Sequence, residues 1–396
     1  MSPSIWRTAS RVIADSRNTP SSYSTTRLCA LAYRPISTYG YTQAKALVYP
    51  KNGPIPEVLN LHTHSISPPH SNLLTLRTIS APLNPADINQ IQGTYPTAPP
   101  FTTNLGTPTP HAVPGNEACF EVLSAGTNAK SVKKGDWVIP RATGLGTWRT
   151  HLQCEEDKVV RVEKEGLDSK QVATVNVNPV TAWRMLKDFG IKEGEWFIQN
   201  GANSGVGRAA IQFGRMWGLK SIAVVRGRPG EEGEKLRKEL EELGADKVIS
   251  DEELMEKSFK DRVKEWTGRD SISLGLNCVG GDAAMAMAKV LNTGAHMVTY
   301  GAMSKSPMRV GASMLIFKDI KFDGFWVSRW ADQHPEKKKI TVESILQLIR
   351  ENKFKDVPMV EVPWNWDTKK EDLVEAIQGT LEGYRKGKGI FVFGDT

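Results

Sequence analysis

The sequence predicts an α/β protein with a β-rich module and a doubly wound parallel sheet. Three observations lead to this fold class. A chain of 396 residues exceeds one small core, so two domains of ordinary size are expected. From about Lys45, short apolar stretches are interrupted by Pro and Gly, which is typical of a β-rich module. After about Val172, strand-like and helix-like segments alternate, which is typical of a parallel sheet with helices on both faces.

The segment over 1–37 differs from the rest in composition. It is rich in Ser and Thr and has a single acid, Asp15. Its arginines are Arg7, Arg11, Arg17, Arg27 and Arg34. A basic, hydroxylated segment without a long apolar run is typical of a mitochondrial presequence, and a disordered basic tail is the alternative. Removing its five positive charges and one negative charge lowers the formal net charge from +7 to +3, so no nucleic-acid partner is expected.

The β-rich module is predicted over 38–178. Its strands are expected at KALVYP (45–50), LLTLRTISAPL (73–83), GNEACFEVLSAG (115–126) and GDWVIPRA (135–142). No stretch of the chain approaches the roughly 18 apolar residues of a membrane helix, so no membrane span is expected. The cysteines include no CxxC pair, which argues against a structural zinc site and against a disulfide framework. Free cysteines fit a reduced compartment such as the mitochondrial matrix. They are Cys29, Cys119, Cys154 and Cys278.

The parallel-sheet domain is predicted over 179–328. Its strands are expected at EWFIQNG, KSIAVVR, DKVIS, SISLGLNCVG, GAHMVTYG and DIKFDGFWVS. Helices are expected at VGRAAIQFGRMWG and EGEKLRKELEELG, with a further polar helix running through Trp266. The remaining 329–396 are predicted to form a helix near Thr341–Glu351 and a final strand, GIFVF, that returns to the β-rich module.

A glycine-rich turn joins the first of these strands to the first helix. In NGANSGVGRAA, Gly205, Gly207 and Ala210 fit G-x-G-x-x-A. The glycines permit a tight turn and close backbone approach to a pyrophosphate at the helix N-terminus. The strand–turn–helix setting therefore predicts a dinucleotide site, and a turn without a ligand is the alternative.

The end of the next strand distinguishes NADPH from NADH. There the chain reads Val225-Arg226-Gly227-Arg228, where NAD enzymes usually carry an acid for the ribose 2′-hydroxyl. Guanidinium groups suit a 2′-phosphate through charge-assisted bonds, so NADPH is favoured. Two solvated loop arginines would give the same pattern.

These motifs resemble the medium-chain dehydrogenase/reductase superfamily, in which a GroES-like β-rich catalytic domain accompanies a Rossmann cofactor domain. The segment PGNEACFEV resembles the superfamily's GHE segment, with Asn116 where the zinc enzymes carry a histidine ligand. The cysteine-rich lobe of those enzymes is missing too, so the resemblance implies no metal. From about residue 40 onward, IQGTYP, NVNPVTAWRML, QNGANSGVG, VVRGRPG, YGAMSKSP and GFWVSRW resemble mitochondrial trans-2-enoyl-acyl-carrier-protein reductases.

The resemblance implies NADPH-dependent reduction of the 2,3 double bond of trans-2-enoyl thioesters in mitochondrial fatty-acid synthesis. The substrate would be carried by acyl carrier protein or coenzyme A, and a homodimer is expected. The catalytic tyrosine falls on Tyr95, as proton donor or enolate stabiliser. The cofactor contacts fall on Asn178, Asn203, Ser204, Gly205, Val206, Arg226, Gly227, Arg228, Tyr300, Gly301, Ala302, Met303, Phe325, Trp326, Val327 and Lys388. Lys386 is the alternative to Lys388.

The chemistry suits Tyr95, because a neutral phenol can donate to an enolate oxygen or deliver a proton. Gly93 would allow close approach and Pro96 would stiffen the loop; by itself Tyr95 reads as an ordinary loop residue. Phe325 and Trp326 either line an acyl tunnel or belong to the core. Arg329 and the run Lys337-Lys338-Lys339 are candidates for a basic rim that meets acidic acyl carrier protein, or else a solvated surface.

Two other functions stay open at this point. A zinc-free NADPH quinone or enone reductase shares the glycine turn. An NADPH-binding protein that has lost catalysis shares the whole cofactor site.

Overall fold

The computed structural model describes residues 40–380 and 387–396. The predicted presequence over 1–37 therefore lies outside the described residues, as does Lys386. No helix in the described part of the chain is long and apolar enough to cross a membrane.

The β-rich module is built on a sheet with the strand order β14-β15-β3-β4-β5-β7, in which β6 also pairs with β3. The strands are β3 (Leu73–Pro82), β4 (Cys119–Ala125), β5 (Trp137–Pro140), β6 (His151–Glu155), β7 (Val159–Val162), β14 (Met359–Trp364) and β15 (Lys388–Phe393). A separate antiparallel pair is formed by β1 (Thr42–Val48) and β2 (Asn60–Ile66). The short helical elements of this part are α1 (Ile55–Val58), α2 (Pro85–Gln92), the 3₁₀ turn Glu156–Lys158, α3 (Ser169–Thr174) and α13 (Lys370–Gln378).

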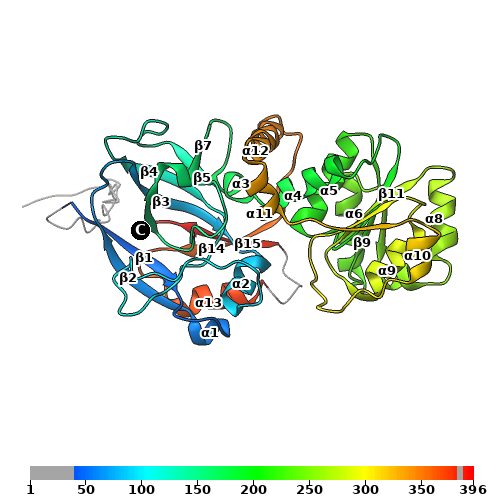
Figure 1. Cartoon of the computed structure of the whole chain (residues 1–396), viewed down its shortest axis with the longest axis horizontal. Helices are drawn as coiled ribbons and strands as arrows, with labels where there is room; N and C mark the ends of the chain where they lie inside the picture. The colour runs from blue at the N-terminus through cyan, green and yellow to red at the C-terminus, as the bar shows by residue number, and fades with distance from the viewer. Residues whose placement is uncertain (1–39, 381–386) are drawn as a thin grey trace, which may run out of the picture. The chain divides into compact units, whose positions relative to one another are not determined.

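The C-terminal strands complete this sheet. β15 pairs antiparallel with β3, with Ile390 opposite Pro82, and β14 pairs parallel with β15. Figure 1 shows the red strands β14 and β15 among the blue and cyan strands of the module. The predicted return of the chain is thus present, and aromatic side chains seal it, since Phe391 contacts both Trp148 and Trp364. The exact limits near 178 and 328 stay predictions.

The second sheet is parallel throughout and has the order β10-β9-β8-β11-β12-β13. Its strands are β8 (Trp196–Asn200), β9 (Lys220–Val225), β10 (Lys247–Ser250), β11 (Ile272–Asn277), β12 (His296–Thr299) and β13 (Lys321–Gly324). Counted from β8, the order is 3-2-1-4-5-6, the Rossmann arrangement. The helices that follow the β-rich module are α4 (Asn178–Asp188), α5 (Gly205–Met216), α6 (Glu231–Leu243), α7 (Asp251–Met255), α8 (Phe259–Thr267), α9 (Gly281–Val290), α10 (Ala312–Ile316), α11 (Val327–Gln333) and α12 (Pro335–Arg350).

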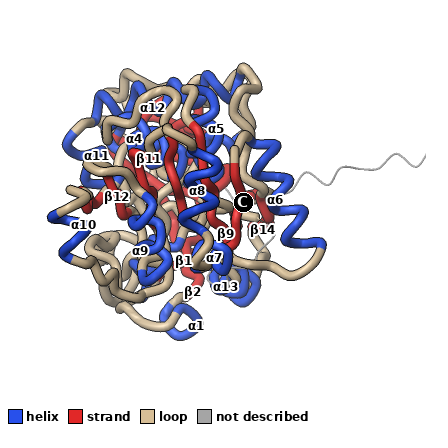
Figure 2. Tube along the Cα trace, turned by 90° about the vertical axis from the view of Figure 1, so that its right-hand side faces the viewer, coloured by secondary structure: helices blue, strands red, loops and turns tan. Residues whose placement is uncertain are grey.

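Helices cover both faces of this sheet (Figure 2). In β8, Ile198 packs in one apolar cluster with Met287 of α9, whereas the adjacent Phe197 packs in another with Phe213 of α5. Successive strand residues point to opposite faces, so a strand covered on both sides is apolar throughout. This explains why EWFIQNG reads as a continuous buried strand.

Three elements differ from the predictions. The polar segment through Trp266 forms two helices, α7 and α8. Helix α12 begins at Pro335 and not near Thr341, because proline is well suited to the first helical turn. The last parallel strand ends at Gly324, and Val327 already opens α11.

Candidate active site and dinucleotide site

Helix α2 places Tyr95. The helix starts with a capping box, in which the Asp87 carboxylate accepts the backbone N–H of Asn84 at 2.8 Å. It ends at Gly93, whose φ of 75° is in the left-handed region that favours glycine. A Cβ at this position would also lie 2.9 Å from the Cβ of Asn52. Gly93 thus stops the helix and turns the chain, and Tyr95 follows two residues later.

The hydroxyl of Tyr95 contacts Trp326. The indole Nε1 donates a hydrogen bond of 2.9 Å to the phenolic oxygen, and the two rings meet edge-on with centroids 6.0 Å apart. An indole N–H can only donate, so the phenol keeps its own proton for another acceptor. Trp326 directly precedes α11, just beyond the end of β13. The bond therefore joins the loop after α2 to the carboxyl end of the parallel sheet.

Tyr95 is held in its protonated form. Partial burial raises the pKa of the Tyr95 phenol, the nearby Asp87 carboxylate raises it further, and the hydrogen bond from Trp326 only partly opposes this. A phenol with a raised pKa remains a proton donor throughout the neutral range.

A buried polar network lies behind α2. The amide Nδ2 of Asn116 donates to Asp87 Oδ1 at 2.6 Å and to Gln90 Oε1 at 2.7 Å, and its Oδ1 accepts the backbone N–H of Gly144 at 2.8 Å. Burial raises the pKa of Asp87 to about 7, although hydrogen bonds from Asn84 and Asn116 oppose the rise. Asn116 therefore fixes the helix that carries Tyr95.

Lys388 belongs to the same buried region. Its Nζ donates to Asn84 Oδ1, and Asn84 Nδ2 donates to Glu117 Oε2 at 2.9 Å. The other oxygen of Glu117 accepts the backbone N–H of Val177 at 2.9 Å. Burial lowers the pKa of Lys388 and raises that of Glu117, and each of the two opposes the shift of the other. In this structure Lys388 thus contacts a residue of the β-rich module. Its contact with the cofactor stays a prediction.

Asn84, Asp87 and Glu117 were not predicted from the sequence. A signal for them exists, because Asn84-Pro-Ala-Asp87 has the spacing of a helix capping box. What the sequence does not reveal is that the capping carboxylate is fully buried.

The glycine turn forms a tight cradle at the N-terminus of α5. Ser204 caps the helix, since its Oγ accepts the backbone N–H of Gly207 at 3.1 Å. A Cβ on Gly207 would lie 2.5 Å from the carbonyl oxygen of Ala202, and one on Gly205 would lie 2.8 Å from Asn178 Nδ2. Only glycine fits at 207, where the close atoms are backbone, whereas a side chain at 205 would push against that of Asn178. Asn178, predicted from a distant motif, therefore lies directly against the turn.

The turn lies where the strand order reverses, between β8 and β11. There Asn200 Nδ2 donates to Asn277 Oδ1 at 2.8 Å, and Asn200 Oδ1 accepts the backbone N–H of Cys278 at 2.8 Å. In open α/β sheets, ligands bind at such a switch point, beyond the carboxyl ends of the strands. The paired asparagines thus fix the ends of β8 and β11 relative to each other.

The loop after β12 closes the other side of the crevice. The backbone N–H of Met303 donates to the carbonyl of Cys278 at 2.9 Å. The hydroxyl of Tyr300 is buried without a hydrogen bond of good geometry in the described residues, and Ser204 and Cys278 are its polar neighbours. Burial raises the pKa of Tyr300 well above its ordinary value. An orphaned hydroxyl beside the glycine turn fits a bound dinucleotide that supplies the missing partner.

The arginines after β9 are not equivalent. Arg228 forms an ion pair with Glu232, one turn along in α6, and the backbone N–H of Gly227 donates to Asp251 Oδ1 at 2.8 Å. Arg226, which follows β9 directly, is exposed. Which of the two contacts a 2′-phosphate stays a prediction.

Phe325 and Trp326 have different environments. Phe325 is buried in the core cluster shared with Val327 and Trp330, whereas Trp326 reaches Tyr95. Phe325 is therefore a core residue in this structure.

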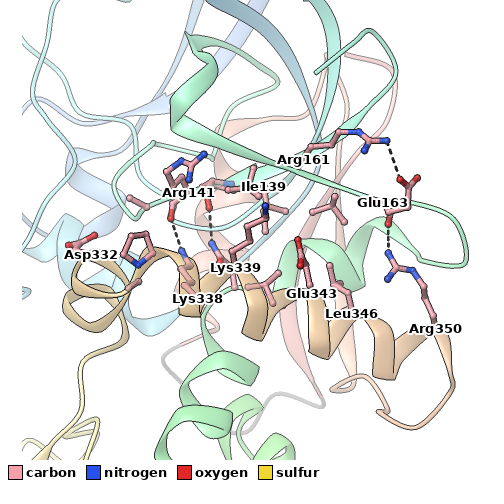
Figure 3. Close-up of a pocket in the computed structure, with 18 residues that line it drawn as sticks. Ile139, Arg141, Arg161, Glu163, Asp332, Lys338, Lys339, Glu343, Leu346 and Arg350 are labelled. Atoms are coloured by element: carbon pink, nitrogen blue, oxygen red, sulfur yellow. Dashed lines mark hydrogen bonds and ion pairs between the residues drawn. The ribbon is translucent and has the colours of Figure 1, made fainter. Parts of the chain in front are cut away.

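A cavity of about 450 Å³ lies between β5, β7 and α12 (Figure 3). Its apolar lining residues are Ile139, Pro140, Ala142, Val160, Val162, Ala331, Pro335, Val342 and Leu346. Asn176, two residues before Asn178, contributes to the wall and donates to the carbonyl of Pro140 at 2.9 Å. Neither Phe325 nor Trp326 is among the lining residues.

Lys338 does not behave as a solvated lysine. Its Nζ donates to the carbonyl of Arg141 at 2.7 Å, and both residues line the cavity (Figure 3). Burial lowers the pKa of Lys338 to about 8, against the attraction of Glu117 and Asp332. Lys337 and Lys339 remain exposed. Within 40–380 and 387–396, no three His, Cys, Asp or Glu side chains gather as a metal site would require.

Comparison with known proteins agrees with this geometry. The family described as "Alcohol dehydrogenase GroES-like domain" matches 70–164, and the one described as "Zinc-binding dehydrogenase" matches 205–342. Among solved structures, the mitochondrial 2-enoyl thioester reductase Etr1p/Etr2p heterodimer from Candida tropicalis has a TM-score of 0.83 at 36% identity, over 88% of this chain and 99% of that one. The Etr1p complex with NADP and crotonyl-CoA has a TM-score of 0.84 at 35% identity, over 88% and 99% of the two chains. A putative NADPH:quinone reductase from Bacillus thuringiensis, at 22% identity and a TM-score of 0.74, shares the fold.

Two relatives are similar over most of their length. The mitochondrial enoyl-acyl-carrier-protein reductase of Yarrowia lipolytica is 47% identical over 315 residues, 80% of this chain and 82% of that protein. The protein of the same name from Schizosaccharomyces pombe is 40% identical over 368 residues, 91% of this chain and 98% of that protein. The GroES-like domain and the Rossmann sheet expected from the sequence are thus confirmed, and the chain belongs to the mitochondrial enoyl-acyl-carrier-protein reductases.

Proposed function

We propose that this chain reduces the 2,3 double bond of trans-2-enoyl thioesters with NADPH in the mitochondrial matrix, as an oxidoreductase that acts on a CH–CH bond. The names of its relatives and the NADP and crotonyl-CoA bound by Etr1p support this reaction. The observation that carries the proposal is the bond from Trp326 to Tyr95, which positions a protonated phenol beside the carboxyl end of the parallel sheet.

The dinucleotide would be held by the glycine turn 203–206, by Asn178 and by the loop 300–303. Arg226 would contact its 2′-phosphate. NADPH supplies the hydride that reaches the β-carbon of the substrate. The backbone N–H groups at the start of α5 would neutralise the pyrophosphate.

Tyr95 would complete the reduction at the α-carbon. As negative charge develops on the thioester oxygen, the phenolic O–H is the donor that can stabilise the enolate or protonate it. Trp326 acts as a positioning residue: its N–H occupies the phenolic oxygen, which directs the phenolic proton away from the indole. Asp87 supports the same state, because a nearby carboxylate disfavours the phenolate.

The acyl chain would enter the cavity between β5, β7 and α12. The apolar half of its lining residues includes Ala331, five residues beyond Trp326, and the other half, which includes Asn176 and Glu343, is polar or charged. Burial of one methylene contributes ~0.8 kcal/mol, or roughly fourfold in kcat/KM. Longer enoyl chains would therefore be favoured until the cavity is filled.

Acyl carrier protein is the proposed physiological carrier. It is acidic, and the exposed Lys337 and Lys339 lie at the start of α12, where Lys339 also lines the cavity. Arg329 stacks its guanidinium over the Trp326 ring, 5.2 Å from the ring centroid. These three cations would form the rim that meets the carrier.

The assembly is proposed to be a homodimer through the edge of the parallel sheet. β13 is an edge strand, and the segment before it exposes Leu315, Ile316 and Phe317, the last with 77% of its surface accessible. A contiguous exposed apolar group next to an unpaired strand edge is typical of an interface. The heterodimer described for Etr1p and Etr2p supports pairing of two such chains.

The test is NADPH consumption by the purified protein with 2-enoyl thioesters of increasing chain length, on coenzyme A and on acyl carrier protein. We expect the turnover of enoyl thioesters to rise with chain length and to exceed the rate of NADPH oxidation by quinones. Rapid oxidation of NADPH by quinones, with no turnover of any enoyl thioester, would contradict it.

A further inference from the structure

A second cavity, of about 820 Å³, lies on the β-rich module away from the dinucleotide crevice. Its walls are β2, the segment 99–113, the loop 141–145 and β6. Apolar side chains, including Ile66, Leu105 and Leu152, line part of it. No residue proposed above for catalysis or cofactor binding lines it, but Arg141 and Ala142 line both this cavity and the one assigned to the acyl chain, so the two adjoin.

Arg149 lines this cavity and carries a charge that nothing compensates in the described residues. Its Nη2 donates to the carbonyl of Leu145 at 2.8 Å, its Nε is buried without a partner, and no carboxylate among residues 40–380 and 387–396 forms an ion pair with it. Burial lowers the pKa of Arg149 to about 10, so the group stays cationic at neutral pH. Arg149 is partly buried and lines the cavity, and a guanidinium there without a carboxylate partner favours an anion in the cavity.

A second unsatisfied group lies on the same wall. The ring of His64 stacks on His62, with centroids 5.8 Å apart, and its buried Nδ1 has no hydrogen-bond partner as far as the structure describes the chain. Burial and the nearby Arg149 lower the pKa of His64 to about 4, so the imidazole is neutral. Because Nδ1 has no accessible surface, the neutral ring would offer an N–H from its other nitrogen, Nε2, to an oxyanion in the cavity without adding charge.

The remaining charged groups of the wall have partners. Asp157, the carboxylate that lines the cavity, forms an ion pair with Lys158 at 3.3 Å, and its backbone carbonyl accepts from Arg141 Nε at 2.7 Å. His111 Nδ1 lies 2.7 Å from the carbonyl of Thr109. No carboxylate of this wall is therefore paired with Arg149.

We propose that this cavity binds an organic oxyanion, a carboxylate or a phosphate ester, whose charged end pairs with Arg149 and His64 and whose apolar body contacts Ile66, Leu105 and Leu152. The site is connected to the loop of Tyr95 in two ways. Pro99 and Pro100 of its wall follow Tyr95 closely in the chain, and Gly144 of its wall donates to Asn116. Occupancy would therefore order the loop that carries Tyr95.

Binding is tested on the full chain by isothermal titration calorimetry and thermal unfolding, with octanoate, octyl phosphate, inorganic phosphate and octanol as probes. Octanoate or octyl phosphate should bind and, at ten times its Kd, raise Tm by about 2 °C, whereas octanol should not. Binding of octanoate alone assigns a carboxylate, and binding of octyl phosphate assigns a phosphate ester. Equal binding of octanol, or no binding of either anion, would overturn the proposal.

Variants locate the site. Arg149→Met should weaken the binding roughly 10- to 100-fold, because a charge-assisted contact is lost, and should leave turnover of crotonyl-CoA unchanged. Removal of an uncompensated charge should also not lower the Tm of the free protein. Lys134→Met, an exposed change outside the cavity, is the matched control and should bind like the wild type. Arg149→Lys and His64→Gln should bind the anion with affinities between those of the wild type and Arg149→Met. If Arg149→Met fails to fold, these two variants test whether the anion binds at this site.

The acyl cavity is a second place where octanoate could bind. Val342→Trp, which fills that cavity, should leave the oxyanion affinity intact. Binding that is lost in Val342→Trp but kept in Arg149→Met would refute the assignment.

Discussion

Replacing Tyr95 by Phe isolates the phenolic O–H from everything else that the side chain does. The ring stays, and with it the edge-on contact to Trp326, so the loop after α2 keeps its packing. Only the donor is lost, together with the acceptor for the indole N–H. Removal of one donor to a developing oxyanion costs ~2.7–4 kcal/mol, so kcat for crotonyl-CoA should fall about 100- to 1,000-fold.

A partner variant separates chemistry from positioning. Trp326→Phe retains the phenol and removes a neutral hydrogen bond of 2.9 Å to it, which is worth ~0.5–1.5 kcal/mol and predicts a loss of roughly 2- to 10-fold in kcat. Because Trp326 acts through Tyr95, the same change in the Tyr95→Phe background should cost almost nothing. The coupling energy of this double-mutant cycle measures the positioning term directly.

The assay is steady-state NADPH oxidation at saturating substrate, with the Kd of NADPH followed by fluorescence and folding by circular dichroism. NADPH affinity of Tyr95→Phe should stay near that of the wild type. A Tyr95→Phe enzyme that keeps a third or more of the wild-type kcat would remove Tyr95 from the chemistry. Equal losses from Trp326→Phe in both backgrounds would show that Trp326 acts on substrate or cofactor by itself.

Four further predictions concern other parts of the molecule. Arg226→Ala should raise KM for NADPH roughly 10- to 100-fold and leave KM for NADH nearly unchanged, as parallel assays with the two cofactors would measure. Val342→Trp should lower kcat/KM for a 12-carbon enoyl thioester by roughly tenfold or more but leave crotonyl-CoA almost unaffected, since only the longer chain reaches that wall. Phe317→Asp should produce monomers in light scattering if the proposed interface is right, with activity at the unchanged cleft as the control for folding. The pKa of His64 is about 4 in the folded chain and 6.5 in the unfolded chain, so between these values the unfolded chain binds one proton more. The free energy of unfolding should therefore be highest above about pH 6.5 and should fall towards pH 4 by about 1–2 kcal/mol, after allowance for solvent screening. Denaturant titrations should show this loss in the wild type and not in His64→Gln.

The parallel sheet was the most predictable part of the fold. Its strands are buried on both faces and therefore read as apolar runs, as at Trp196–Asn200, and each is separated from the next by a helical segment of ordinary length. The start of α12 was missed because the run Glu336-Lys-Lys-Lys339 carries no apolar periodicity. The pairing of β15 with β3 joins segments at opposite ends of the chain, and local patterns could suggest the return but not its register.

At the candidate site, residues within recognisable motifs could be predicted from the sequence, whereas contacts between distant segments could not. The glycine turn and Asn178 come from motifs, and the structure places them in contact. The contact between Tyr95 and Trp326 could not be read from either segment, because it depends on how the loop after α2 meets the end of β13. Each residue alone fits an ordinary loop or core position.

Asn116 stands where the zinc enzymes carry a metal ligand, but in this structure its amide makes hydrogen bonds. The resemblance to zinc enzymes identifies it only as a residue that replaces a ligand. In the structure its side chain uses both donor hydrogens and its acceptor, on Asp87, Gln90 and Gly144, so all of its polar capacity is satisfied in a buried place. Two of these partners lie on α2 and the third on the loop that borders the oxyanion cavity. Asn116 therefore joins α2, which precedes Tyr95, to the wall that carries Gly144, so that a change at this wall would be felt first at the hydrogen bond from Gly144 to Asn116.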